Sequence, residues 1–161
     1  MSRVKSKNTR QELLVRSLLH QLGYRFRLHR KDLPGTPDLV LPKHCVAVFV
    51  NGCFWHGHDC ARGKLPKTNR EFWESKIQIN IERDERAQQA LRNLGWSTIV
   101  VWSCETGSAS RLTELGHRLV REIHEKSRLN KASEDSPRFE LNAEEPTVSY
   151  DVSDRDLGNN D

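Results

Sequence analysis

Side chains that can bind metals or transfer protons are concentrated in one stretch of the chain, residues 49–60 (FVNGCFWHGHDC). This stretch holds two of the four cysteines and two of the seven histidines in the 161-residue sequence. An apolar run at residues 46–50 leads into it, as expected for a buried strand. The pattern indicates a chemically active loop that follows directly on a strand.

The spacing of Cys53, His58 and Cys60 is typical of a zinc site. Structural zinc takes four sulfur or nitrogen ligands in a tetrahedral arrangement. Two residues are candidates for the fourth position: Cys104, which follows a predicted strand, and His56, which lies within the loop. A closed set of four ligands leaves no open position, so this zinc is expected to hold the polar loop in place.

His56 is available for proton transfer if Cys104 is the fourth zinc ligand. A histidine with a near-neutral pKa beside an acid is a candidate general base. The candidate acid is Asp38, at the start of a short apolar run that is typical of a buried strand. A hairpin between this strand and the strand before the loop places Asp38 close to Val50 and Asn51.

Glu12 has two interpretations. It lies three residues after Thr9, which is the spacing of a capping box at a helix start. It also lies at the N-terminal end of the apolar stripe of the same helix, so the alternative is a carboxylate that points into a site beneath the helix, although position alone favours the capping role.

Phe54 and Trp55 cannot both turn inward in so short a loop. Exposed aromatic side chains on a basic protein can stack on bases or wedge between base steps. The alternative interpretation is that the two rings cover the zinc site.

Three predicted helices and four predicted strands must position these residues. Apolar periodicity and turn residues predict helices at residues 9–22, 70–94 and 110–125, and strands at residues 24–28, 38–41, 45–50 and 96–102. Asn80 and Asp84 interrupt the apolar face of the long helix at helical spacing, so they lie at the surface or serve a site.

Charge divides the chain into three parts. The formal net charge of +4 hides nine acidic and two basic residues in residues 132–161. The preceding residues therefore carry 24 of the 26 Lys and Arg but 13 of the 22 Asp and Glu, which is typical of a protein that binds a polyanion such as nucleic acid. We expect a short basic arm at residues 1–8, a folded domain at residues 9–130 and an acidic, disordered tail at residues 131–161.

No apolar run is long enough for a transmembrane helix, and the basic start of the chain lacks the apolar core of a secretory signal. We therefore expect a cytoplasmic protein that does not associate with membranes. In that reducing compartment, four cysteines indicate metal binding more than disulfides.

Several motifs resemble those of the very short patch repair (Vsr) DNA mismatch endonucleases. They are Pro37-Asp38, the stretch at residues 49–60, Glu71-Phe72-Trp73, Asn80, Arg83-Asp84, Leu94-Gly95-Trp96 and Val101-Trp102-Ser103-Cys104. The resemblance covers about residues 1–125, and its GCFWH core is highly specific. It implies a restriction-endonuclease-like α/β fold, related to the PD-(D/E)XK nucleases, with a mixed central sheet flanked by helices and a structural zinc site.

The resemblance also implies a role for each candidate residue. Asp38 and the backbone carbonyl of Val50 bind catalytic Mg²⁺, His56 activates water, and Glu12 supports the site through hydrogen bonds. The implied Zn²⁺ ligands are Cys53, His58, Cys60 and Cys104, and the implied DNA-binding residues are Phe54, Trp55, Trp73, Lys76 and Asn80.

The main departure from the family pattern is Asn51, where a histidine that assists catalysis is usual. An asparagine can form hydrogen bonds there but cannot titrate. We therefore include Asn51 among the catalytic candidates, with a lower rate expected.

The activity implied is nicking of one DNA strand 5′ to the thymine of a T·G mispair that arises when 5-methylcytosine deaminates. The expected partner is double-stranded DNA bound by a monomer in a bacterial, nucleoid-associated location. Functional links to a cytosine methyltransferase and to mismatch-repair proteins are also implied. Two alternatives are a zinc-stabilised mismatch-binding module whose cleavage is impaired by Asn51, and a related nuclease with a different target.

Overall fold

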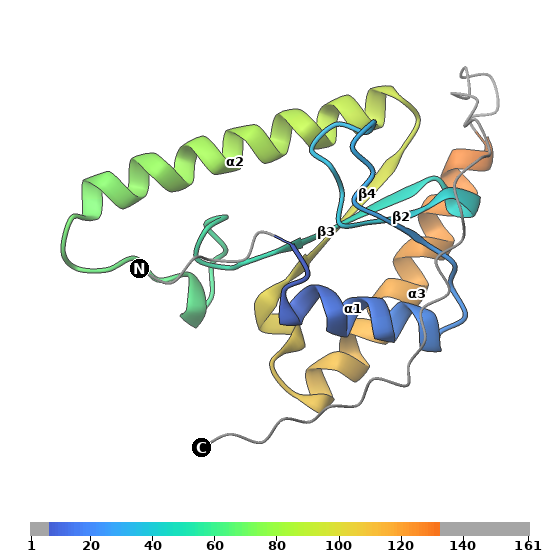
Figure 1. The fold of residues 1–161 in the computed structure, drawn as a ribbon, viewed down its shortest axis with the longest axis horizontal. Helices are drawn as coiled ribbons and strands as arrows, with labels where there is room; N and C mark the ends of the chain where they lie inside the picture. The colour runs from blue at the N-terminus through green and yellow to red at the C-terminus, as the bar shows by residue number, and fades with distance from the viewer. Residues whose placement is uncertain (1–6, 133–161) are drawn as a thin grey trace.

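The computed structural model describes residues 7–132 and contains a four-stranded mixed sheet with helices on both faces (Figure 1). The strands, in spatial order, are β1 (Arg27–Leu28), β2 (Leu39–Leu41), β3 (Val46–Asn51) and β4 (Ser97–Trp102). The helices are α1 (Arg10–Gln21), α2 (Arg70–Asn93) and α3 (Ala109–Ala132), and three short 3₁₀ helices are η1 (Pro42–His44), η2 (Ala61–Gly63) and η3 (Ser103–Thr106). The expected α/β class and mixed sheet are confirmed.

The order of the strands fixes where the loop after β3 lies. β1, β2 and β3 pair antiparallel, and Leu39 of β2 faces Val48 of β3, so the expected hairpin is present. β3 and β4 pair parallel along their whole lengths. Parallel neighbours require a crossover, and here the loop and α2 provide it. Both strands therefore end at the same edge of the sheet.

The two faces of the sheet have separate cores because side chains alternate along a strand. On one face, strand residues such as Leu39, Val48 and Ile99 pack against α1 and α3. On the other face, Val40 and Ala47 pack against a smaller cluster that includes Leu91 of α2. The sheet is thus sandwiched between α1 and α3 on one side and α2 on the other (Figure 1).

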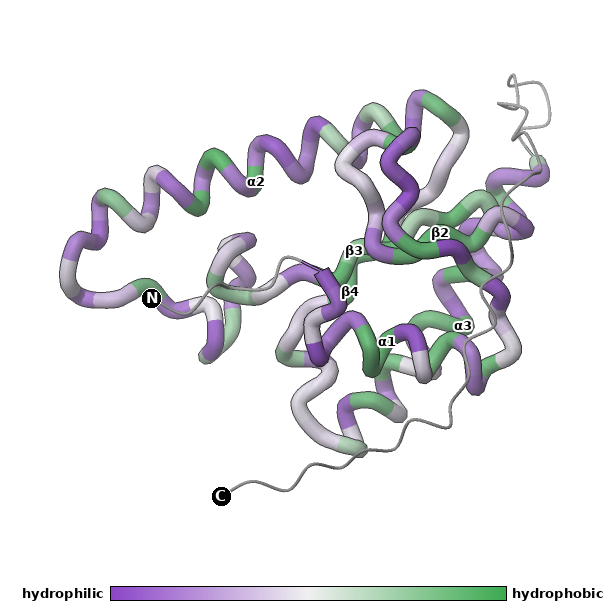
Figure 2. Tube along the Cα trace, in the orientation of Figure 1, coloured by the Kyte–Doolittle hydropathy of each residue, from purple (hydrophilic) through white to green (hydrophobic). Residues whose placement is uncertain are grey.

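Helix α2 has the smallest fraction of buried residues among the three helices. Only Ile77 and Leu91 are buried among its 24 residues. Its N-terminal half extends beyond the sheet and lies beside the loop after β3 (Figure 1). Figure 2 shows hydrophilic residues along most of this helix, broken by isolated hydrophobic ones. The sequence therefore places a long, largely polar helix beside the chemically active loop. No helix within residues 7–132 is both long and apolar enough to cross a membrane.

Two elements differ from the sequence prediction. Only Arg27 and Leu28 of the predicted strand 24–28 pair with β2, opposite Val40 and Leu39. The last helix continues past residue 125 to Ala132. Its end is held by Asn130, whose side-chain amide donates hydrogen bonds to the carbonyls of His44 and Cys45, both at 3.0 Å. Residues 1–6 and 133–161, which include most of the predicted basic arm and acidic tail, lie outside the described residues.

Gly35 provides a test of how closely α2 packs against the turn that precedes β2. Its φ is +74°, and an added Cβ would lie 2.7 Å from the Cβ of Ala87 in α2. Gly23 has a similar φ of +82° but no atom within 4 Å of the added Cβ. We expect Gly23→Ala to lower the free energy of unfolding by about 1 kcal/mol through backbone strain alone, and Gly35→Ala by about 3 kcal/mol because a clash is added. Equal losses in urea denaturation would contradict this packing.

Candidate active site and metal centre

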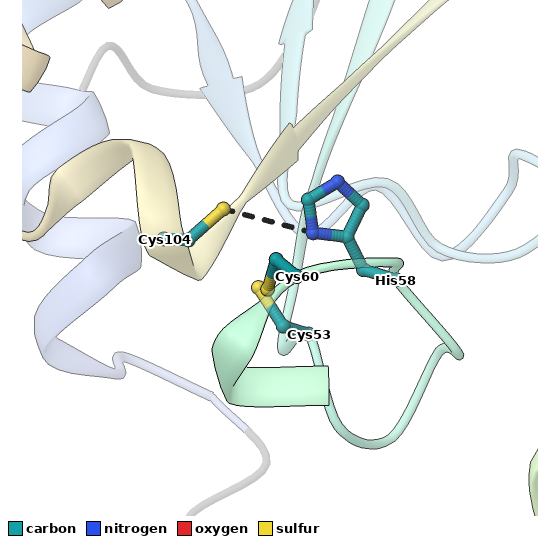
Figure 3. A group of neighbouring side chains, drawn as sticks. All are labelled: Cys53, His58, Cys60 and Cys104. Atoms are coloured by element: carbon teal, nitrogen blue, oxygen red, sulfur yellow. Dashed lines mark hydrogen bonds between the residues drawn. The ribbon is translucent and has the colours of Figure 1, made fainter. Parts of the chain in front are cut away.

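Four metal-binding side chains come together where β3 and β4 end (Figure 3). Cys53, His58 and Cys60 lie in the loop after β3, and Cys104 lies in η3, directly after β4. Their ligand atoms all lie within 4.8 Å of one another, and Cys104 Sγ is 3.6 Å from His58 Nδ1. The parallel pairing of the strands brings these sequence-distant residues together, as expected. Three sulfurs and one imidazole nitrogen fit tetrahedral zinc.

Neighbouring groups fix the orientation of this cluster. The His58 ring stacks on Trp102 with a centroid distance of 4.3 Å. Ser103 Oγ accepts a hydrogen bond from Cys53 N at 3.2 Å and donates one to Cys53 Sγ at 3.1 Å. Burial and the neighbouring Cys53 sulfur raise the pKa of Cys104 to about 11. Crowded sulfurs of this kind ionise together only when a cation offsets their charge, which is the chemistry of a thiolate metal site.

The other candidate for the fourth position and the remaining cysteine lie elsewhere. His56 contacts Asp84 of α2 and is not among the four clustered residues. Cys45 is half-buried at the opposite end of β3, with its Sγ 3.7 Å from the carbonyl of Pro42. The geometry therefore favours Cys104 over His56 for the fourth ligand position.

A second cluster lies around Asp38, at the start of β2. Val50 N donates a hydrogen bond to Asp38 Oδ2 at 2.7 Å, so the expected proximity of these residues is confirmed. Burial raises the pKa of Asp38 to about 6, against the opposing effect of the Val50 N–H, and the charge of Glu12 raises it further. Carboxylates that bind cations are commonly buried and have an elevated pKa when the cation is absent.

Glu12 fulfils both of its interpretations. Thr9 Oγ1 accepts a hydrogen bond from Glu12 N, and the Glu12 carboxylate accepts from Asn8 N at 3.0 Å, so the residue caps α1. The same carboxylate is almost completely buried and groups with Asp38. Arg16, one turn along α1, donates a hydrogen bond to it at 3.2 Å. The helix start therefore delivers a carboxylate to the site.

His29 belongs to this second cluster, and the sequence analysis did not identify it. Its N–H donates to the carbonyl of Asp38 at 3.3 Å, which continues the β1–β2 pairing by one residue. Its Nε2 lies 3.7 Å from Glu12 Oε2 and 3.0 Å from an Arg16 nitrogen. Burial lowers its pKa. The strand register was the available signal, since Leu28 faces Leu39 and the next pair is His29 with Asp38.

His56 is held by a carboxylate other than the one expected. Its Nδ1 contacts the side chain of Asp84 in α2, whereas Asp38 bonds to Val50. Asp84 thus contacts a candidate site residue, so the structure is consistent with the second of its two alternatives. Asn80, one turn earlier, donates a hydrogen bond to the carbonyl of Trp55 at 2.9 Å. Helix α2 therefore holds the loop through two side chains, and the Asp84 contact fixes the His56 ring.

Aromatic residues form a group between the loop and the start of α2. Phe54 lies 5.1 Å from Trp55 and 5.3 Å from Trp73 between ring centroids, in edge-to-face geometry. Trp55 is exposed, and so is Phe72, whose ring lies beneath the ammonium group of Lys76. The ring that stacks on His58 is that of Trp102, so the cluster of Cys53, His58, Cys60 and Cys104 is covered by a residue other than Phe54 and Trp55. Asn51, at the end of β3, is buried.

The zinc interpretation predicts different effects for two cysteines. Cys104→Ser removes a clustered sulfur, so we expect zinc content to fall from one ion per chain after dialysis and the free energy of unfolding to fall by several kcal/mol. Cys45→Ser is the matched control and should retain one zinc ion. One tightly bound zinc in purified Cys104→Ser, measured by elemental analysis, would contradict the assignment.

The elevated pKa of Asp38 predicts a pH-dependent stability without divalent cations. The folded protein binds this proton more tightly than the unfolded chain, so stability is lost as pH rises from about 4 to about 6. Asp38→Asn keeps an oxygen for the Val50 N–H and removes the charge. We expect it to raise the free energy of unfolding by about 2 kcal/mol at pH 7.5 and by little at pH 4. Glu85→Gln, on the exposed face of α2, is the control, and an equal gain at both pH values would refute the pKa assignment.

Comparison with known proteins identifies relatives that are aligned over more than two thirds of the chain. The family model for the DNA mismatch endonuclease Vsr matches residues 1–62. The type II nicking enzyme V.XorIIP of Xanthomonas oryzae pv. oryzae is 56% identical over 112 residues, which are 70% of this chain and 82% of the relative. V.NmeAIP of Neisseria meningitidis serogroup A, also a type II nicking enzyme, is 45% identical over 76% of this chain and 88% of its own length. The DNA mismatch endonuclease Vsr of Escherichia coli is 40% identical over 71% of this chain and 73% of its own length. The chain belongs to the Vsr family of DNA mismatch endonucleases.

Proposed function

We propose that this protein is a Mg²⁺-dependent DNA endonuclease that nicks one strand 5′ to the thymine of a T·G mispair. The observation that carries the proposal is that the Asp38 carboxylate, with Glu12 beside it, accepts a hydrogen bond from Val50, directly before the loop that bears His56 and the exposed ring of Trp55. The names of the relatives, which are nicking enzymes and a mismatch endonuclease, support the reaction class. Restriction-endonuclease-like architecture follows from membership of the family.

The carboxylates of Asp38 and Glu12 fit a hard cation, because Mg²⁺ prefers oxygen ligands. We assign the carbonyl of Val50 as a further oxygen ligand. Bound Mg²⁺ would supply charge neutralisation at the phosphate and at the leaving oxygen. The Val50 N–H holds the Asp38 carboxylate in position through its 2.7 Å hydrogen bond. Glu12 is fixed in the same way by the start of α1.

His56 is proposed to accept the proton of the attacking water. Asp84 contacts its Nδ1, which leaves Nε2 directed away from α2 and free to accept a proton. The negative charge of Asp84 stabilises the imidazolium that forms. Asn51 can orient the water or a phosphate oxygen by hydrogen bonding but cannot exchange a proton. Proton transfer therefore depends on His56 alone.

Mispair selection is proposed to come from the aromatic group. Phe54, Trp55 and Trp73 contact one another edge to face, so they can enter a base step together as one rigid wedge. A T·G step is cheaper to unstack than a Watson–Crick step, which favours insertion at the mispair. Lys76 supplies a positive charge beside this group for phosphate contact. Asn80, whose amide holds the loop carbonyl of Trp55, is proposed to position the wedge as well as to face DNA.

The zinc cluster has a structural role in this proposal. The loop that it closes carries His56 and the aromatic residues but buries little apolar surface of its own. Cross-linking that loop to η3 would fix both the base and the wedge relative to the Asp38 carboxylate. We further propose functional coupling to a cytosine methyltransferase and to mismatch-repair proteins, with the enzyme acting as a monomer near the nucleoid.

The second candidate function is a mismatch-binding module with impaired cleavage. The observation that favours it is Asn51, a buried amide in place of the histidine expected at the site. The two functions differ in one measurable property, which is whether the bound strand is cut.

A labelled duplex with one T·G mispair tests the proposal. With Mg²⁺ we expect a single nick 5′ to the thymine and none in the matched T·A duplex. Asp38→Ala should abolish the nick, and Asp84→Asn should slow it about 10²–10⁴-fold with binding retained, because His56 loses its orienting charge. Glu85→Gln, on the adjacent exposed position, should cut at the wild-type rate.

Three outcomes would reject parts of the proposal. A nick that persists in Asp38→Ala would remove Asp38 from the reaction. Tight mispair binding without any nick would establish the binding module, and recovery of cutting in Asn51→His would then identify Asn51 as the cause. A nick at matched duplexes would indicate a nuclease with another target.

A further inference from the structure

Three side chains from three elements meet at the proposed cation site. Glu12 comes from α1, His29 follows β1, and Asp38 precedes β2. One ligand atom of each lies within 4.8 Å of the others. Two ligands of one octahedral ion lie about 3 Å apart when they are adjacent and about 4.2 Å apart when they are opposite, so the three side chains can share an ion that draws them closer together.

A hydrogen bond determines which nitrogen of the His29 ring carries a lone pair. Its Nε2 lies 3.0 Å from a terminal nitrogen of Arg16. A guanidinium group only donates hydrogen bonds, so Nε2 is the acceptor and carries a lone pair rather than a proton. The same Nε2 lies 3.7 Å from Glu12 Oε2. The ring therefore directs a metal-binding lone pair at the Arg16 nitrogen, which lies beside the Glu12 carboxylate.

Arg16 occupies the position between two of these groups. One of its terminal nitrogens donates to Glu12 Oε2 at 3.2 Å and to His29 Nε2 at 3.0 Å. The side chain is 5% exposed, and its Nε is buried without a hydrogen-bond partner within residues 7–132. A buried cation that bridges two potential metal ligands competes directly with a metal ion for the same lone pairs.

We infer that His29 is a third side-chain ligand of the catalytic cation. In the absence of a divalent ion, the guanidinium group of Arg16 occupies the position of that cation beside Glu12 and His29. The inference rests on the proposed function, which places that cation at Asp38. It adds a nitrogen to a site otherwise built from oxygens. Imidazole suits first-row transition ions better than Mg²⁺, which keeps to oxygen ligands. A ligating His29 therefore raises the affinity of the site for Mn²⁺.

Mn²⁺ alone, added to the full-length zinc-loaded protein, is the probe. Electron paramagnetic resonance gives its dissociation constant, and pulsed measurements detect coupling to a ligating ¹⁴N nucleus. We expect ¹⁴N coupling in the wild type, its loss in His29→Gln, and about tenfold weaker binding in that variant. Arg16→Met removes the competing charge and should bind Mn²⁺ about tenfold more tightly. His117→Gln, on the exposed part of α3, is the control and should match the wild type.

The outcomes separate the inference from the function on which it rests. Coupling that is absent in the wild type, persists in His29→Gln, or disappears only in His56→Gln overturns the role of His29. Unchanged affinity in Arg16→Met overturns the role of Arg16. Unchanged Mn²⁺ binding in Asp38→Asn would instead reject the cation site of the proposed function. Zinc content and near-ultraviolet circular dichroism establish that each variant is folded.

Discussion

The parallel pairing of β3 with β4 is the constraint on which the rest of the structure depends. It places Cys104 beside a loop that begins at Cys53, and it requires a crossover that only a long connection can provide. The crossover helix α2 then lies against the same loop and supplies Asp84 to His56. One strand pair therefore determines both the metal cluster and the partner of the proposed base.

Local patterns predicted the site wherever a short spacing or a single strand pair was sufficient. Cys53, His58 and Cys60 are close in sequence, and the β2–β3 hairpin placed Asp38 beside Val50. The partner of His56 depends on the angle at which α2 crosses the loop, and no local pattern encodes that angle. His29 was missed because it lies beyond the apolar alternation, in a left-handed conformation with φ of +45°.

Opposing charges are buried together beneath α1, and each depends on the others. Glu12 raises the pKa of Asp38, while Arg16 has the opposite effect on it. Both Glu12 and Arg16 are nearly inaccessible, so neither charge is well solvated alone. Burying these charges costs desolvation free energy, so the cluster contributes little to the stability of the helix end. We interpret it as a preformed anionic site in which Arg16 is the counter-ion. These side chains can accept a cation in place of Arg16.

The contact between His58 and Cys104 also has a topological consequence. A metal ion held by both sides would convert residues 53–104 into a closed ring that contains all of α2 and β4. Closing a ring of this size restricts the unfolded chain much as a long-range disulfide does. The ring would also limit how far the two ends of the exposed helix α2 could move apart if part of the helix frayed. In this way a helix with only two buried residues can keep a fixed position beside the loop that it contacts.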